Sequence, residues 1–120
     1  MIERQNGGED EVVILITTFP DQESAHRIGG HWVESRLAAC VNLVPGVESL
    51  YRWEGKVETG AEILALVKTT RARLPELEAS LRSLHPYELP ELLVIPPTDG
   101  SSDYLGWVRN GVSTESPPGR

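Results

Sequence analysis

Residues 39–70 alternate polar and apolar side chains on both sides of two breaks in the pattern. Such alternation is typical of β-strands that have one covered face. Pro45-Gly46 cannot lie within an unbroken central ladder, so we expect a long strand over 39–53 with a bulge or bend at this pair. Glu54-Gly55 then makes a turn, and the strand pattern resumes over 56–70. The sequence therefore predicts a long β-hairpin.

Two further segments have the composition of buried strands. Val12–Phe19 reads VVILITTF, which is β-branched or apolar at nearly every position and suits a strand that is covered on both faces. Leu92–Ile95 reads LLVI and is closed by Pro96-Pro97. We expect four strands in the folded unit.

Three segments are predicted to be helical. Asp21 can cap a helix whose apolar residues recur every three or four positions, although Gly29-Gly30 within it has no explanation in the sequence. Leucines mark an apolar stripe over 74–84, and His85-Pro86 ends that helix. Ser101 can cap a short terminal helix.

The order of the elements is β, α, β, β, α, β, followed by the terminal helix. Right-handed crossovers then place the four strands in one antiparallel sheet with both helices on one face, which is the ferredoxin-like arrangement of an α+β protein. A chain of 120 residues has the usual size of one domain. We expect that domain over 12–112, with mobile tails over 1–11 and 113–120.

Charge and cysteine content exclude several functions. Eighteen acidic against eleven basic residues leave a net charge of −7, which argues against nucleic acid and anionic membrane surfaces as partners. The single cysteine, Cys40, cannot form an intramolecular disulfide or a thiolate zinc site, and we read it as a small buried side chain. The first eleven residues lack the apolar stretch of a secretion signal, so we expect a cytosolic protein.

The densest group of polar and aromatic residues is the segment His85–Glu91, HPYELPE. A rigid loop that presents an imidazole, a phenol and carboxylates could hold a divalent cation or orient a small ligand through His85, Tyr87, Glu88 and Glu91. The alternative is that His85 ends the helix, Tyr87 packs with a bonded hydroxyl, and the glutamates are solvated.

Lys68 lies among aliphatic residues of the predicted third strand and needs an anionic partner if it is buried. Glu88 or Glu91 would supply one, whereas a lysine at a strand end could instead keep its amine in water. Four aromatic residues are expected at the hairpin tip or on the terminal helix, where they favour either a subunit interface or core packing. These residues are Tyr51, Trp53, Tyr104 and Trp107.

Several ordered segments resemble the CutA family of divalent-cation tolerance proteins. They are Leu37-Ala38-Ala39-Cys40-Val41-Asn42, Pro45-Gly46, Ser49-Leu50-Tyr51, Trp53-Glu54-Gly55-Lys56, Lys68-Thr69-Thr70, His85-Pro86-Tyr87-Glu88, Pro90-Glu91-Leu92 and Tyr104-Leu105-Gly106-Trp107. The resemblance implies a ferredoxin-like homotrimer similar to PII signalling proteins, a link to copper and other divalent metals, and no enzymatic activity. At the positions of three copper ligands in one bacterial branch, this sequence has Ile16, Leu84 and His85, so His85 alone is retained.

Three function classes follow. The first is a metal-responsive CutA-like trimer that binds Cu²⁺ or Zn²⁺; the second is a PII-like or ACT-like sensor of an organic ligand or partner protein; the third, an enzyme, lacks a nucleophile and base pair. We expect the site in a cleft between subunits, formed by 85–91 with Lys68 and the Trp53-Glu54 tip. Lys68 and His85 flank one helix of about 21 Å, so a neighbouring subunit would have to bring them together.

Overall fold

The computed structural model describes residues 1–114 of the chain. The elements in chain order are β1 (Ile2–Arg4), β2 (Val12–Phe19), α1 (Gln22–Glu34), β3 (Cys40–Trp53), β4 (Lys56–Thr70), a 3₁₀ turn (Arg71–Arg73), α2 (Leu74–Leu84), β5 (Leu93–Ile95), β6 (Asp99–Ser101) and α3 (Ser102–Gly111). The helix caps predicted at Asp21 and Ser101 are confirmed, since each side chain accepts a hydrogen bond from a backbone N–H of the first turn of its helix.

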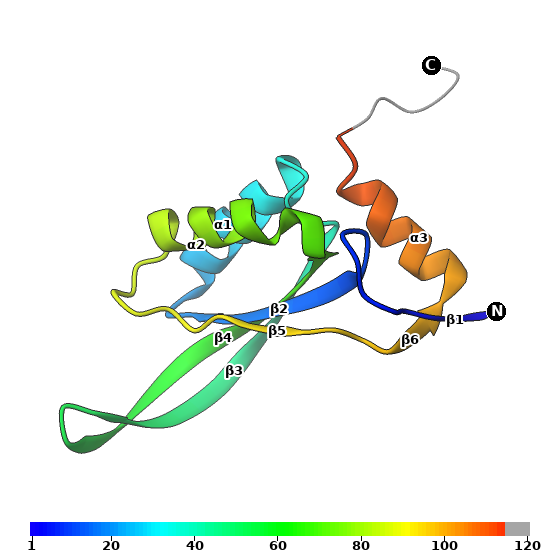
Figure 1. Cartoon of the computed structure of the whole chain (residues 1–120). Coiled ribbons are helices and arrows are strands. Elements are labelled where there is room, and N and C mark those ends of the chain that lie inside the picture. The colour runs from blue at the N-terminus through cyan, green and yellow to red at the C-terminus, as the bar shows by residue number, and fades with distance from the viewer. Residues whose placement is uncertain (115–120) are drawn as a thin grey trace.

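The main sheet has the strand order β3-β4-β2-β5, and every neighbouring pair is antiparallel. Helices α1 and α2 lie together on one face of this sheet (Figure 1). This topology confirms the predicted ferredoxin-like α+β fold.

The two faces of the main sheet differ in what covers them. The helix face carries the core, in which Leu15, Phe19, Ala65 and Val67 are fully buried under the helices. Trp32 of α1 is also fully buried, and its indole N–H donates to Ser80 Oγ of α2 at 2.9 Å. We call the opposite side the open face. Because side chains alternate along a strand, it carries Ile14, Ile16, Thr18, Leu64, Leu66, Lys68, Leu93 and Ile95.

The predicted bulge in the long strand is confirmed and changes which residues share a face. Val44 pairs with Leu64 but Val47 pairs with Glu62, so β3 advances three residues while β4 advances two. Gly46 has φ +78° in this segment, a conformation that glycine adopts at low cost. Beyond the bulge, odd-numbered residues of β3 therefore lie on the open-face side, where even-numbered residues lie before it.

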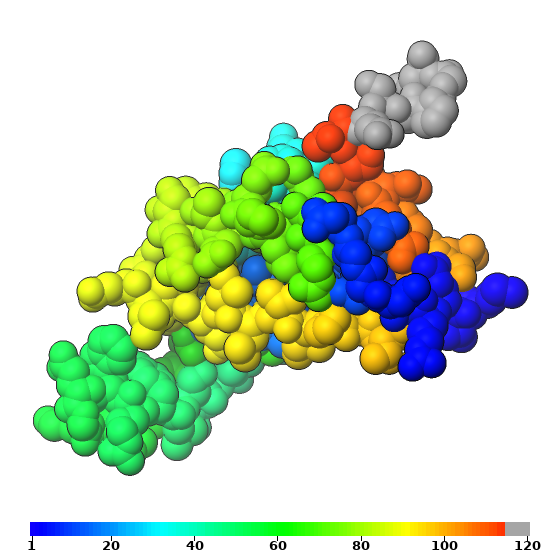
Figure 2. Space-filling model, in the orientation of Figure 1, coloured from blue at the N-terminus to red at the C-terminus, as the bar shows by residue number. Residues whose placement is uncertain are grey.

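The hairpin of β3 and β4 projects beyond the rest of the molecule. β2 pairs with β4 only over 63–70, so residues 47–62 pair only with each other around the Glu54-Gly55 turn. Figure 2 shows this end as a separate lobe below the helices. The protein measures 55 × 28 × 23 Å, and its radius of gyration of 15.6 Å exceeds the value of about 14 Å expected for a compact chain of this length.

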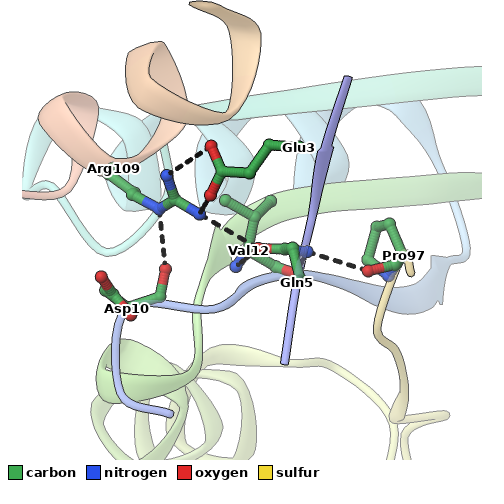
Figure 3. A network of polar contacts seen from close by, with 6 residues as sticks. All are labelled: Glu3, Gln5, Asp10, Val12, Pro97 and Arg109. Atoms are coloured by element: carbon green, nitrogen blue, oxygen red, sulfur yellow. Dashed lines mark hydrogen bonds and ion pairs between the residues drawn. The ribbon is translucent and has the colours of Figure 1, made fainter. Parts of the chain in front are cut away.

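We expected a mobile tail over 1–11, and in the structure this N-terminal segment makes contacts with the C-terminal part of the domain. β1 pairs antiparallel with β6, and the Gln5 side chain donates to the carbonyls of Val12 and Pro97 while it accepts from the N–H of Val12. Arg109 of α3 pairs with Glu3 at 3.0 Å and donates to the carbonyl of Asp10 (Figure 3). These contacts join segments about a hundred residues apart. Of the predicted tail 113–120, residues 115–120 lie outside the described residues.

One of the two unexplained helix glycines has a packing role. A Cβ on Gly29 would lie 3.3 Å from Val41 Cγ1, so glycine allows α1 to lie close to β3. A Cβ on Gly30 would meet nothing within 4 Å, and nothing in the structure explains this second glycine.

Candidate functional site

A groove of about 660 Å³ lies between the projecting hairpin and the segment that connects α2 to β5. It begins where β2 ends, so the hairpin forms one wall and the connecting segment forms the other. Its lining residues are Thr18, Ser49, Leu50, Tyr51, Trp53, Gly60, Ala61, Glu62, Tyr87, Leu89 and Glu91. The bulge in β3 places Ser49, Tyr51 and Trp53 on the same side as Glu62.

Glu62 is an acidic residue of this groove that hydrogen bonds hold in place. Its Oε2 accepts a hydrogen bond from the Tyr87 hydroxyl at 2.8 Å. Burial raises the pKa of the Glu62 carboxyl, but hydrogen bonds from Ser49, Tyr87 and Thr18 outweigh burial and hold this pKa below its usual value. Glu62 is therefore a carboxylate at neutral pH.

Tyr87 is fixed from two sides. Its backbone N–H donates to His85 Nδ1 at 3.0 Å, and the two rings lie 4.9 Å apart. Burial, followed by the hydrogen bond to Glu62, raises the pKa of the Tyr87 phenol well above its ordinary value. The phenol therefore keeps its proton and remains a donor to Glu62.

His85 supports this arrangement from within the protein. It is only 7% exposed and stacks on Phe19, with ring centroids 5.0 Å apart. Its Nε2 lies 2.6 Å from the carbonyl oxygen of Thr18, which can only accept, so Nε2 carries the hydrogen and Nδ1 is left to accept from Tyr87. This is the neutral tautomer, and both nitrogens are engaged. In this structure His85 follows the last residue of α2 and Tyr87 packs with a hydrogen-bonded hydroxyl, as in the structural alternative to a ligand site.

Lys68 lies at the other end of the sheet, and of the two alternatives for its amine, the ion pair with Glu88 or Glu91 is not formed within this chain. Its Nζ lies 3.0 Å from the Tyr104 hydroxyl of α3 and 5.3 Å from the centre of that ring. The hydrogen bond with Tyr104 raises the pKa of Lys68, against the lowering effect of burial. The physical reason is register: Lys68 pairs with Ile14, near the start of β2, whereas the connecting segment lies beyond its end.

The structure brings together three of the predicted site residues, Trp53, Tyr87 and Glu91, in the wall of the groove. Glu54 lies in the exposed hairpin turn, and Glu88 is exposed outside the lining. Sequence reasoning missed Glu62, although a signal existed. It is an acidic residue that alternates in phase with Leu64 and Leu66 of the same strand, so it lies on the same face as these two leucines.

Within residues 1–114, no three His, Cys, Asp or Glu side chains are grouped closely enough to hold a metal ion. The same part of the chain has no helix of sufficient length and apolarity to cross a membrane.

Comparison with known proteins gives concordant matches. The family model described as CutA1 divalent ion tolerance protein matches residues 13–111. A divalent-cation tolerance protein CutA from Thermus thermophilus is 48% identical over 99 residues, which are 82% of this chain and 95% of that protein. One from Pectobacterium atrosepticum is 45% identical over 98 residues, which are 82% of this chain and 89% of that protein.

Solved structures agree with these matches. CutA from Xylella fastidiosa has a TM-score of 0.84 at 40% identity and covers 86% of this chain and 99% of its own. CutA from Synechococcus elongatus has a TM-score of 0.87 at 34% identity and covers 94% of this chain and 96% of its own.

Proposed function

This chain belongs to the CutA1 family of divalent ion tolerance proteins, and from that premise we propose that it acts in the response to divalent metal ions as a cytosolic homotrimer. The resemblance predicted from the sequence is confirmed by the family match over residues 13–111. That match, together with relatives of 45–48% identity that are named for divalent-cation tolerance, is the observation that carries the proposal. Deletion of the gene is the direct test: it should lower the concentration of Cu²⁺ or Zn²⁺ at which cells stop growing, and unchanged growth would contradict the role.

The homotrimer is supported by surfaces that one copy leaves uncovered. Leu93 and Ile95 on the open face are 59% and 49% exposed, and the projecting hairpin adds exposed Leu50, Trp53 and Val57. β3 and β5 are edge strands with unpaired backbone groups. A second and third copy would cover both features.

Light scattering tests this assembly. We expect a mass of three times 13.2 kDa at micromolar concentration, and a mass near 13.2 kDa would refute the trimer. Trp53→Ala and Trp107→Ala remove large apolar side chains that are 48% and 52% exposed in one copy, so each should weaken association by about 2–4 kcal/mol if it is buried between subunits. Val33→Ala, on the helix side of the molecule, is the matched control and should leave the mass unchanged.

Direct binding of Cu²⁺ or Zn²⁺ is part of the proposal, with His85 as the predicted ligand. A metal ion at Nδ1 would replace the hydrogen bond from the Tyr87 backbone, so binding should be coupled to movement of the 85–91 segment. Calorimetric titration with Cu²⁺ should show weaker binding in His85→Gln, while the exposed control His26→Gln should match the unmodified protein. Equal affinity in all three proteins would remove His85 as a ligand.

A second candidate function is favoured by one observation, the aromatic-lined groove beside the hairpin. A groove of this size, with a few convergent polar groups, is typical of small-molecule sites. We therefore propose a PII-like or ACT-like sensor of an organic ligand as the alternative. A thermal-shift screen separates the two functions, because a ligand at 100 times its Kd adds about 2.7 kcal/mol. Stabilisation by metals alone would favour the tolerance role, and stabilisation by organic compounds alone the sensor.

The proposal also includes a non-enzymatic role and a cytosolic location. The role follows the relatives' names, which describe tolerance rather than a reaction. The location is supported by the single free cysteine, which is typical of proteins from reducing compartments. Relatives from rice and Arabidopsis thaliana are named chloroplastic, and a solved Archaeoglobus fulgidus protein is named periplasmic, so cell fractionation is the decisive measurement.

A further inference from the structure

We propose that the groove over Glu62 binds a small organic cation, an ammonium group attached to a hydrocarbon chain. This inference rests on the second candidate function, that of a sensor, and names the class of its ligand. It depends on three properties of the groove within residues 1–114: an ionised carboxylate that forms no ion pair, aromatic rings beside it, and the absence of lysine and arginine from its lining.

The first property is the charge of Glu62. Hydroxyl groups of Ser49, Tyr87 and Thr18 donate hydrogen bonds to its carboxylate without bringing positive charge, and the nearby His85 makes a smaller electrostatic contribution. Across residues 1–114, the ion pairs of acidic side chains involve Glu3, Glu11, Glu23, Glu76 and Glu78, and none reaches Glu62. Glu91 adds a second carboxylate to the lining, which in the described part of the chain contains neither lysine nor arginine. The groove is therefore a negatively charged site.

The second property is the aromatic wall. Tyr51 and Trp53 from β3 and Tyr87 from the connecting segment all line the groove, and in a single copy Tyr51 and Trp53 are 47% and 48% exposed, so a neighbouring copy that covers the hairpin would cover part of this wall. The faces of such rings attract cations, and the attraction is stronger where water is partly excluded. Leu50 and Leu89 add apolar surface that a hydrocarbon chain could cover.

Together these properties favour an organic cation over a divalent metal ion. A hard divalent cation needs several oxygen ligands, whereas the carboxylate of Glu62 is already engaged by hydroxyl donors and no three His, Cys, Asp or Glu side chains gather closely enough to hold a metal ion within residues 1–114. An alkylammonium ion sheds water more readily, and it can place its charge near Glu62 while its carbon atoms contact the rings. The volume of about 660 Å³ lies within the usual range for sites of small organic ligands.

The test is a titration of the full-length protein with n-butylammonium, n-butanol and Zn²⁺, followed by nuclear magnetic resonance of the Glu62 and Tyr87 signals. Butanol has nearly the same shape as butylammonium but no charge. We expect saturable binding of butylammonium, with shifts confined to the groove, and affinity for butanol lower by about tenfold or more, because butanol has no charge that the carboxylate and the aromatic rings could attract.

Two variants and a matched control assign the effect. Glu62→Gln keeps the shape but removes the charge and should weaken butylammonium binding by about tenfold. Glu48→Gln removes the same charge from an exposed residue of β3 outside the lining and should have no effect. Tyr51→Leu keeps an apolar side chain but removes a ring, and it should weaken the cation more than the alcohol.

Several outcomes would overturn the inference. Equal binding of butanol and butylammonium would show an apolar groove without cation selectivity. Binding of Zn²⁺ alone, lost in Glu62→Gln, would show a metal site. Butylammonium binding that disappears as protein concentration rises and the copies assemble would show that a side chain of a second copy occupies the groove. Absence of binding, together with an intact trimer and metal stabilisation, would refute this inference while the tolerance function stands.

Discussion

Replacement of Gly111 by alanine should destabilise the protein, because this glycine allows α3 to lie against the segment before β3. A Cβ at Gly111 would lie 2.7 Å from the Cβ of Ala39 and 3.2 Å from its Cα. Ordinary carbon–carbon contacts are about 3.5–4.0 Å, so the helix end has to move by nearly 1 Å. Ala39 presents backbone and a single methyl group, so it has no flexible side chain that could turn aside.

The magnitude follows from two opposing effects. Overpacking of this kind costs about 1–3 kcal/mol, whereas alanine improves helix propensity over glycine by at most about 1 kcal/mol and by less at the last helical residue. We expect a net loss of about 1–2 kcal/mol in the free energy of unfolding. For 120 residues the unfolding entropy is about 250 cal/mol/K, so the melting temperature should fall by about 4–8 °C.

Gly106→Ala in the same helix is the matched control. A Cβ at Gly106 would meet nothing within 4 Å, so only the gain in helix propensity remains, and this variant should be more stable by up to about 1 kcal/mol. Urea denaturation followed by circular dichroism, at equal protein concentration for all three proteins, measures both changes. A Gly111→Ala protein as stable as the Gly106→Ala protein would refute the packing argument.

Three further predictions concern single substitutions. Gly30→Ala should stabilise α1 by up to about 1 kcal/mol, since its Cβ would enter open space; a fall in melting temperature would contradict this. Gln5→Ala removes four side-chain hydrogen bonds, which join Gln5 to Val12, Pro97 and Arg109, and the amide of Val12 should lose protection against hydrogen exchange; unchanged protection would show that these hydrogen bonds are dispensable. Tyr87→Phe removes a donor to Glu62 and should raise its pKa. The pKa of Glu62 is lower in the folded than in the unfolded protein, so ionised Glu62 stabilises the fold above its unfolded-state pKa, and this stabilisation is lost as pH falls through its folded-state pKa. The loss of folding stability in Tyr87→Phe should therefore become smaller as pH falls. A loss that stays constant in denaturation measured across this pH range would contradict this.

Local physical rules were sufficient for most of the fold. The alternation over 39–70 predicted both long strands, and Pro45-Gly46 predicted the bulge at the position where the register shifts. Asp21 and Ser101 predicted helix starts because a capping side chain needs only its own first turn. The ordered family segments also predicted the family that the match over 13–111 confirms.

Those local rules could not predict the strand pair of β1 and β6. Each strand has only three residues, and their partners lie about a hundred positions apart. Neither segment has the apolar alternation that marks a strand, because polar contacts of Gln5 and Arg109 stabilise the pair instead. No local signal distinguishes such a segment from a tail.

The sequence by itself determined which side chains the site could use, since loop 85–91 and the hairpin tip contributed Tyr87, Glu91 and Trp53. Only the tertiary structure decided which of them meet. The bulge turns Tyr51 and Trp53 toward the side of Glu62, and the register of β4 takes Lys68 to the far end of the sheet. A shift of one residue in pairing reverses the face of every side chain that follows, and such a shift depends on contacts between strands rather than on the composition of either strand.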